Sequence, residues 1–316
     1  WIEVSQDKIQ SILTAFEKIN QSDTLKNLTL AEAMRLELAK NEWLRLPEEE
    51  AEVEVSQGQW LQSVRNQLLQ PNTLQEVALS PGFKAQLRGY QEEGYRWLCL
   101  MSSLGLGACL ADDMGLGKTV QVLALLCWQK QSGSGKTSLV VAPKSLLFNW
   151  MSEAARFAPA LRCRSYAGPG RERILAELQQ SDLLLTTYGT LRADVELLSR
   201  CAFDYCILDE SQAIKNGDSA TAKAVRTIKA EHRLAMTGTP VENRLNELFS
   251  QLEFLNPGLL GEKFLAGCSR IAYDLTEEQT LRLRRALHPF LLRRTKSDVA
   301  RDLPVKTEKV LFCELD

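Results

Sequence analysis

The segment ADDMGLGKT, Ala111–Thr119, constrains the fold of this chain more strongly than any other stretch of it. Its end matches the phosphate-binding loop G-x-x-x-x-G-K-[ST], in which backbone N–H groups and the Lys contact nucleotide phosphates and the Ser or Thr hydroxyl holds Mg²⁺. The match is incomplete, because Asp112 stands where the first Gly should be. The surrounding sequence therefore has to decide whether the segment is such a loop.

The surroundings of the segment favour a phosphate-binding loop. Such a loop leaves a strand and enters a helix, so that the phosphate meets the helix N-terminus. Ala108–Ala111 is a short apolar run typical of a buried strand, and the stretch from Thr119 onward has the pattern of an apolar helix. Gly115 and Gly117 allow the backbone to approach a phosphate closely. A second GKT, within residues 132–137, follows a helix and precedes a strand, so we expect it to be a surface loop.

Short apolar runs alternate with helical stretches along the middle of the chain. We expect strands at residues 107–111, 138–142, 161–166, 182–186, 204–208 and 233–236. We expect helices at residues 118–131, 145–157, 171–179, 188–200, 219–229 and 243–255. Strands that alternate with crossover helices form a parallel sheet with helices on both faces. The predicted fold class is therefore α/β.

Composition divides the chain of 316 residues into three predicted regions. Residues 1–80 carry 7 Lys and Arg against 13 Asp and Glu, and we expect a helical accessory region with an acidic linker that can dock a protein partner. Residues 81–261 hold the predicted sheet. Residues 262–316 form an Arg-rich extension predicted to be largely helical, with 9 Lys and Arg against 3 Asp and Glu in residues 281–310.

Bulk properties exclude several classes of protein. The net charge of −2 gives no overall signature of nucleic-acid binding, and the basic stretch alone is typical of a solvated helical face. The 8 Cys form no C-x-x-C pair and the chain has only 2 His, so we expect no zinc site. Several Cys lie in apolar runs, which favours a reducing compartment. There is no apolar run of about 18 residues, so we expect no membrane span.

Two carboxylates follow one of the predicted strands. In the sequence DYCILDESQ, Asp209 and Glu210 come directly after the strand at residues 204–208. Ligands of open parallel sheets bind at this end of the strands. An ATPase with a phosphate-binding loop needs one carboxylate for Mg²⁺ and another to orient the attacking water. The segment Thr237–Pro240 follows the next predicted strand and would bring hydroxyl groups to the same edge.

These segments, in this order, resemble the Swi/Snf-type ATPases of helicase superfamily two. The resemblance extends over about residues 87–306 and rests on seven segments: LRGYQ, ADDMGLGKT, VVAPKSLLFNW, TTYGTL, ILDESQAIKN, LAMTGTPVEN and PFLLRRTKSDV. It implies a RecA-like lobe, the N-terminal motor lobe of the family. Members of this superfamily commonly lack the first Gly of the loop, which accounts for Asp112. The amino-acid sequence of these segments is more similar to that of bacterial or archaeal members than to that of nuclear remodellers.

The resemblance implies an ATP site with Mg²⁺ and a role for each residue. Lys118 would contact the β- and γ-phosphates, Thr119 and Asp209 would hold Mg²⁺, and Glu210 would position the hydrolytic water, so that Lys118 and Glu210 are the catalytic pair. Gln91 would read the adenine. The full set implied for nucleotide binding is Arg88, Gln91, Met114, Gly115, Leu116, Gly117, Lys118 and Thr119.

The resemblance also implies translocation on duplex DNA, through contacts to the phosphate backbone that carry no base specificity. Such contacts would fall on Pro143, Lys144, Ser145, Thr187, Tyr188, Lys215 and Asn216. Residues expected to couple nucleotide state to DNA grip are Gln212, Thr237, Gly238 and Thr239.

In the family a second RecA-like lobe follows, with an Arg-rich motif that completes the ATP site. We expect that lobe to be absent from this chain, since Arg293 and Arg294 do not match its arginine by position. An arginine finger is worth about 10³–10⁵ in rate in related systems. We therefore expect the 316-residue chain to bind ATP weakly and to hydrolyse it poorly.

Two other functions stay open from the sequence. An RNA helicase of the same superfamily is disfavoured, because the acidic motif is Asp-Glu-Ser-Gln rather than Asp-Glu-Ala-Asp and because Thr-Gly-Thr-Pro replaces Ser-Ala-Thr. A non-enzymatic module that docks partners through residues 1–80 is disfavoured by the intact Lys118, Thr119, Asp209 and Glu210. The expected location is the cytoplasm, associated with the nucleoid, for a prokaryotic protein and the nucleus for a eukaryotic one.

Overall fold

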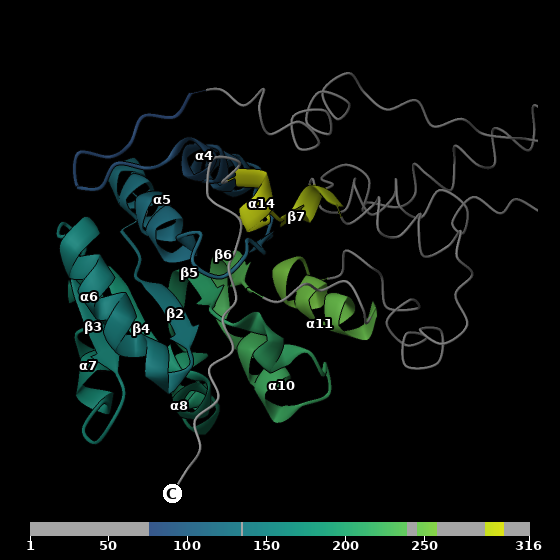
Figure 1. Ribbon diagram of the computed structural model, residues 1–316. Coiled ribbons are helices and arrows are strands. Elements are labelled where there is room, and N and C mark those ends of the chain that lie inside the picture. Colours follow the sequence, from purple (N-terminus) through teal and green to yellow (C-terminus); the bar gives the residue numbers. More distant parts are fainter. Residues whose placement is uncertain (1–75, 134, 239–244, 258–287, 300–316) are drawn as a thin grey trace, which may run out of the picture.

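The chain folds around a parallel sheet, which we describe from a computed structural model over residues 76–133, 135–238, 245–257 and 288–299. The strands are β1 Ala108–Leu110, β2 Ser138–Ala142, β3 Cys163–Tyr166, β4 Leu183–Thr187, β5 Ala202–Leu208, β6 Lys229–Met236 and β7 Leu291–Leu292. They form one seven-stranded sheet in the order β3-β4-β2-β5-β6-β1-β7 (Figure 1). All the recorded strand pairs are parallel. The predicted α/β class with a parallel sheet is confirmed.

Helices cover both faces of the sheet. The longer ones are α4 Gly89–Ser103, α5 Lys118–Ser132, α6 Leu147–Phe157, α10 Ala220–Thr227 and α11 Leu245–Leu255. The short ones are α7 Glu172–Ala176, α8 Tyr188–Ala193, α9 Val195–Leu198 and α14 Lys296–Val299, with 3-10 turns at Lys144–Leu146, Leu178–Gln180, Ser211–Ile214 and His288–Phe290. In Figure 1, α4, α5 and α14 lie at the top of the lobe, and α8 and α10 lie at the bottom.

The alternation of side chains along each strand divides the core into two clusters. In β2, Val140 and Ala142 face the cluster formed with α4, α5 and α6, whereas Leu139 and Val141 face the cluster formed with α8, α9 and α10. All four of these side chains are fully buried. The apolar run that predicted this strand is therefore explained by burial on both faces.

Two of the predicted helices are broken in the structure. The helix expected over residues 171–179 is α7 followed by a 3-10 turn, and the helix expected over residues 188–200 is divided into α8 and α9 at Asp194. The buried carboxylate of Asp194 accepts hydrogen bonds from Arg171 Nε (2.5 Å) and Nη2 (2.9 Å) and from Tyr166 Oη (2.9 Å). These long-range bonds hold Asp194 between the two helices, and sequence periodicity gives no sign of them.

Strand β6 begins earlier than predicted, at Lys229 rather than at residue 233. Apart from Ala230 its first residues are polar, so they give no alternating strand pattern. They pair with β5 from Ala202↔Lys229 onward. Pairing with a neighbour, rather than local pattern, extends this strand.

The described part of the Arg-rich extension is not one helix. Residues 288–299 contain a 3-10 turn, strand β7 and the short α14. Leu291 and Leu292 pair in parallel with Cys109 and Leu110 of β1, which places this segment at the edge of the main sheet. Edge pairing to a strand almost 200 positions away overrides the helical composition around it. The predicted helical region 1–80 lies almost wholly outside the described residues, and the domain boundaries stay predictions.

The sequence predicts no membrane span, and the helices of the structure can be compared with that prediction. Within the described part of the chain, no helix combines the length and the apolar character needed to cross a bilayer.

Candidate nucleotide site

The carboxyl ends of five neighbouring strands bring the predicted site residues to one edge of the sheet. Since the strands are parallel, the residues that follow them lie at the same edge. In spatial order they are Thr187 at the end of β4, Pro143 after β2, Asp209 after β5, Thr237 after β6 and Asp112 after β1. The residues predicted for DNA thus lie mainly on the β4 and β2 side, and those predicted for ATP on the β6 and β1 side. Strand β5 separates the two groups.

The loop between β1 and α5 has the backbone of a phosphate cradle. Gly115 and Gly117 have φ values of 86° and 78°, a region that favours glycine. Gly117 is the N-cap of α5, and the first turn of this helix contains no acidic residue. The unpaired N–H groups and the positive end of the dipole at such a terminus attract phosphate. Lys118 is the first residue of the helix.

Gln91 lies directly against this loop. Its Nε2 donates to the carbonyl of Leu116 (3.0 Å), which also accepts from Tyr90 Oη (3.1 Å). Its Oε1 accepts from the backbone N–H of Arg88 (2.9 Å). A Cβ at Gly117 would lie 2.5 Å from Gln91 Nε2, and the Gly117 φ of 78° is one that other residues rarely adopt, so glycine is favoured there. The structure therefore brings the predicted adenine-reading residue to the loop.

Lys118 is surrounded by oxygen atoms. Its Nζ donates to the carbonyls of Asp112 (2.7 Å) and Asp113 (3.2 Å). Burial lowers the pKa of its ammonium group, while the nearby carboxylates of Asp112, Glu210, Asp209 and Asp113 oppose that shift. The acidic pair after β5 is thus close enough to Lys118 to act on it electrostatically. The two motifs predicted to form one site are brought together.

Asp209 is a buried carboxylate held by an indole. Its side chain is mostly covered, and its Oδ2 accepts a hydrogen bond from Trp150 Nε1 (2.8 Å) while its Oδ1 accepts from the backbone N–H of Glu210 (2.9 Å). Burial raises its pKa, and Glu210 raises it further. The backbone N–H of Asp209 donates to the carbonyl of Val141 in β2 (2.9 Å), so the pairing of β5 with β2 extends to this residue.

Glu210 has a strained backbone. Its φ of 50° is the one positive value among the non-glycine residues that the structure describes. Such a conformation costs of the order of 1–3 kcal/mol and persists only where the surroundings impose it. Its Oε2 accepts from Gln212 Nε2 (2.8 Å), and Gln212 Oε1 accepts from Thr237 Oγ1 (3.2 Å). Thr237 in turn donates its N–H to Leu110 at the end of β1 (3.2 Å).

The segment after β6 lies against the phosphate loop. A Cβ at Gly238 would be 2.6 Å from Met114 Cγ and 3.6 Å from Lys118 Nζ. The predicted coupling residues Gln212, Thr237 and Gly238 therefore form a chain of contacts from Glu210 to the loop. Thr239, the fourth of that group, lies outside the described residues.

The residues predicted to contact DNA have mixed surroundings. Lys144, Ser145, Lys215 and Asn216 are exposed, and Pro143 is half-buried. Thr187 caps α8, because its side chain accepts the backbone N–H of Thr190 (3.0 Å). The hydroxyl of Tyr188 donates to the carbonyl of Asp209 (2.8 Å). Tyr188 therefore connects the expected DNA side to the acidic motif, and DNA contact by these seven residues stays a prediction.

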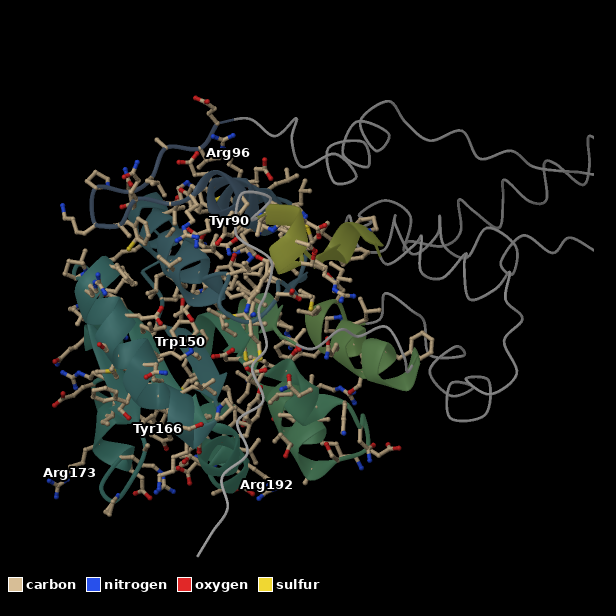
Figure 2. The ribbon with its side chains drawn as sticks, in the orientation of Figure 1. Tyr90, Arg96, Trp150, Tyr166, Arg173 and Arg192 are labelled. Atoms are coloured by element: carbon tan, nitrogen blue, oxygen red, sulfur yellow. The ribbon has the colours of Figure 1, made fainter. Side chains whose placement is uncertain are left out.

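Two partners of the site were missed by sequence reasoning. Trp150 orients Asp209 from α6, and Figure 2 shows it in the middle of the lobe. Arg294, just after β7, forms an ion pair with Asp112, with Nε–Oδ1 at 2.9 Å and Nη2–Oδ2 at 2.5 Å. The sequence contains one indication of the Arg294–Asp112 pair, because an Asp at the end of a buried apolar strand requires a cationic partner.

The residues present fit ATP and Mg²⁺. The glycine-built loop and the acid-free helix terminus match a polyphosphate. Burial and the neighbouring Glu210 raise the pKa of the Asp209 carboxyl, and a divalent cation bound there would offset that crowding of negative charge.

Comparisons with known proteins give the same family throughout. Residues 90–316 match the model of the SNF2-related domain. The protein YwqA of Bacillus subtilis (strain 168), named an ATP-dependent helicase/translocase, is 42% identical over 266 residues, which cover 81% of this chain and 29% of YwqA. The TATA-binding protein-associated factor MOT1 of Saccharomyces cerevisiae is 37% identical over 278 residues, 79% of this chain and 15% of MOT1.

A solved structure agrees with these relatives. The Sulfolobus solfataricus SWI2/SNF2 ATPase core in complex with double-stranded DNA superposes with a TM-score of 0.66 at 40% identity, over 73% of this chain and 49% of that chain. The chain spans less than a third of the length of the two curated relatives described above. It corresponds to about half of the archaeal core.

Proposed function

Because this chain belongs to the SNF2-related family and is a lobe of its ATPase core, we propose that it binds Mg²⁺ and ATP and serves as the first lobe of a motor that moves along duplex DNA. One observation carries the proposal. Lys118 at the start of α5 and the pair Asp209–Glu210 at the end of β5 lie at the same carboxyl edge of the sheet, where both carboxylates oppose the lowering of the Lys118 pKa.

The chain's own residues divide the work of hydrolysis. The loop and Lys118 bind and orient the phosphates, and Gln91, which holds the loop through Leu116 O, would read the adenine. Mg²⁺ held by Thr119 and Asp209 would supply charge neutralisation at the phosphate oxygens. Glu210 orients the attacking water, with its side chain held by Gln212 and its backbone in a left-handed conformation.

The arrangement of the strands supports a path between nucleotide and DNA. Gln212 joins Glu210 to Thr237 on the ATP side, and Tyr188 joins Asp209 to the end of β4. The DNA side would use the exposed Lys144 and Lys215 on phosphates. The archaeal relative was solved with double-stranded DNA, which supports the choice of duplex as the track. Low activity of the 316-residue chain by itself stays a prediction.

A pair of substitutions in the complete protein separates binding from hydrolysis. Glu210→Gln keeps the shape and the acceptor for Gln212, so ATP should bind with nearly unchanged affinity while turnover falls by about 10²-fold or more. Lys118→Ala removes the ammonium group that meets the phosphates, so ATP affinity itself should fall. Isothermal titration with ATP and steady-state phosphate release measure the two effects.

The matched control is Glu177→Gln, since Glu177 pairs with Arg164 on the surface away from the site. It should leave both measurements unchanged. Hydrolysis by Glu210→Gln at the rate of the unaltered protein would refute the role assigned to this residue.

A further inference from the structure

The carboxylate of Asp112 is fully buried, at the position where a complete phosphate loop has glycine. Its partner is the guanidinium of Arg294, which lies 182 positions along the chain and is itself only 11% exposed. The two groups meet in a two-pronged geometry, with oxygen–nitrogen distances of 2.9 Å and 2.5 Å. Such paired bonds fix orientation as well as distance.

The backbone around Arg294 runs along the phosphate loop. The N–H of Ala111 donates to Leu292 O (2.8 Å), and the N–H of Asp113 donates to Arg294 O (3.0 Å). The N–H of Lys296 donates to Asp113 Oδ2 (3.0 Å). The parallel pairing of β7 with β1 therefore continues beyond both strands, and residues 292–296 form one wall of the loop.

The guanidinium also joins the two helices that flank the loop. It donates to Gln121 Oε1 in α5 (3.0 Å) and to the carbonyl of Tyr90 in α4. It lies 5.4 Å from the centre of the Tyr90 ring, and Figure 2 shows Tyr90 in the upper part of the lobe. Gln121 Nε2 in turn donates to Asp112 Oδ2 (3.3 Å) and to Gly117 O (3.2 Å).

A glycine in the middle of α4 makes room for this cluster. A Cβ at Gly94 would lie 1.9 Å from Gln121 Oε1 and 2.7 Å from Arg294 Nη2. Glycine weakens a helix interior relative to alanine. Its presence at a buried position of α4 is explained by the space that the guanidinium and the amide occupy.

The cluster reaches the phosphate-binding lysine through two carbonyl oxygens, those of Asp112 and Asp113. Asp112 O, on the residue that Arg294 holds, accepts the hydrogen bond from Lys118 Nζ at 2.7 Å. We infer that Arg294 is a positioning residue for nucleotide binding, which holds Asp112 and thereby sets the loop and Lys118 for the phosphates. This inference rests on the proposed nucleotide binding. It makes the segment after β7 part of the ATP site of this lobe.

The inference is tested on the complete protein with Arg294→Lys and Gly94→Ala. Lysine keeps the charge but cannot make the two-pronged bond, and alanine displaces the Gln121 amide together with the guanidinium that it accepts from, without changing any charge. A loop held in place helps substrate and transition state alike, so its loss raises KM for ATP and leaves kcat almost unchanged. We expect KM for ATP, and Kd for ADP by titration calorimetry, to rise about tenfold, with kcat within about twofold.

A role in stability alone would have a different signature. It would lower the melting temperature and the apparent kcat, through loss of active molecules, and would leave KM for ATP unchanged. Alanine has a higher helix propensity than glycine, so α4 itself should still form in Gly94→Ala. If Arg294→Lys does not fold, the KM of Gly94→Ala for ATP distinguishes a role in nucleotide binding from a role in stability.

Two controls match the test variants. Arg162→Lys breaks a similar two-pronged pair, with Asp182 (3.0 Å and 2.9 Å), on the exposed end of the lobe. Gly89→Ala alters the same helix α4 at a position where a Cβ would meet nothing within 4 Å. Both should keep KM for ATP unchanged.

The outcomes separate the two proposals. Failure of the unaltered protein to bind ADP would contradict the proposed function itself. Binding by the unaltered protein, together with unchanged KM and Kd in the folded test variants, would overturn the role of Arg294. A rise in KM that the controls share would also overturn it.

Discussion

At the scale of single residues, the orientation of Asp209 depends on Trp150. The indole N–H donates to Asp209 Oδ2 at 2.8 Å, and both residues are buried. Groups that orient a metal-binding carboxylate typically contribute about 10–100-fold to metal affinity. We therefore expect Trp150 to support the proposed Mg²⁺ site through its hydrogen bond to Asp209.

The substitution Trp150→Phe tests this dependence. Phenylalanine keeps most of the apolar volume and removes the N–H, so Asp209 loses one of its two recorded donors. We expect the Mg²⁺ concentration for half-maximal ADP binding to rise about tenfold. Calorimetric titration of ADP at a series of Mg²⁺ concentrations measures the shift.

Trp97→Phe is the matched control, because Trp97 in α4 is an equally buried indole of the same core. It should leave the Mg²⁺ dependence unchanged. Equal Mg²⁺ dependence in Trp150→Phe and the unaltered protein would show that the hydrogen bond has no such role.

The residues of the site differ in how far they could be predicted. Lys118, Asp209 and Glu210 follow strands within short motifs, so local pattern and the parallel sheet suffice to bring them together. Trp150 and Arg294 reach their partners across 59 and 182 positions. Such pairs depend on how α6 and β7 pack, and no local spacing contains that information.

At the scale of elements, Asn256 connects α11 to the beginning of β1. Its Oδ1 accepts from the N–H of Gly107 (2.8 Å), and its Nδ2 donates to the carbonyl of the same residue (3.0 Å). Both bonds are buried. A Cβ at Gly107 would lie 2.2 Å from Leu255 O, so the glycine is required for this close approach. The side-chain amide takes the place of a neighbouring strand for Gly107.

Asn256→Asp should destabilise the lobe. The carboxylate cannot donate to Gly107 O, which leaves a buried carbonyl unpaired and buries a charge, at a cost of about 2 kcal/mol or more. Urea unfolding of the 316-residue chain measures the change. The control is Asn216→Asp. The exposed Asn216 side chain accepts a hydrogen bond from the N–H of Asp218 (3.0 Å), which an aspartate can also accept. This substitution should change the free energy of unfolding by less than about 0.5 kcal/mol. Equal stability of the two variants would contradict the prediction.

The elements themselves were predictable to different degrees. The six expected strands are present because each is a short run with most of its residues buried or paired to a neighbour. The helix over 188–200 was predicted as one piece because the ion pair of Asp194 with Arg171 is invisible in the periodicity. Strand β7 was missed because two residues carry too little pattern, and its pairing with β1 decides its structure.

At the scale of the whole molecule, the order of the strands separates the residues proposed to bind ATP from those proposed to contact DNA. The ATP residues lie on β1, β5 and β6, and the residues expected to contact DNA follow β2 and β4 and continue from β5. Strand β5 lies between them, and Asp209 on its end bonds to Trp150 on α6 and to Tyr188 on α8. If the proposed coupling of nucleotide to DNA exists, these contacts of Asp209 are its shortest route along the carboxyl edge of the sheet.

The chain matches about half of the archaeal ATPase core that was solved with double-stranded DNA. The proposed motor accordingly works as part of the complete protein, and its track is the central claim. Contacts to phosphates predict binding that weakens as salt rises, whatever the base sequence.

The most direct measurement is the steady-state ATPase rate of the complete protein at saturating ATP, with blunt duplex DNA or with single-stranded RNA at equal nucleotide concentration. A motor on duplex DNA predicts that duplex DNA raises kcat more than RNA does, with a stimulation that requires more DNA at higher salt. Equal or greater stimulation by single-stranded RNA, or no response to duplex DNA, would contradict the account.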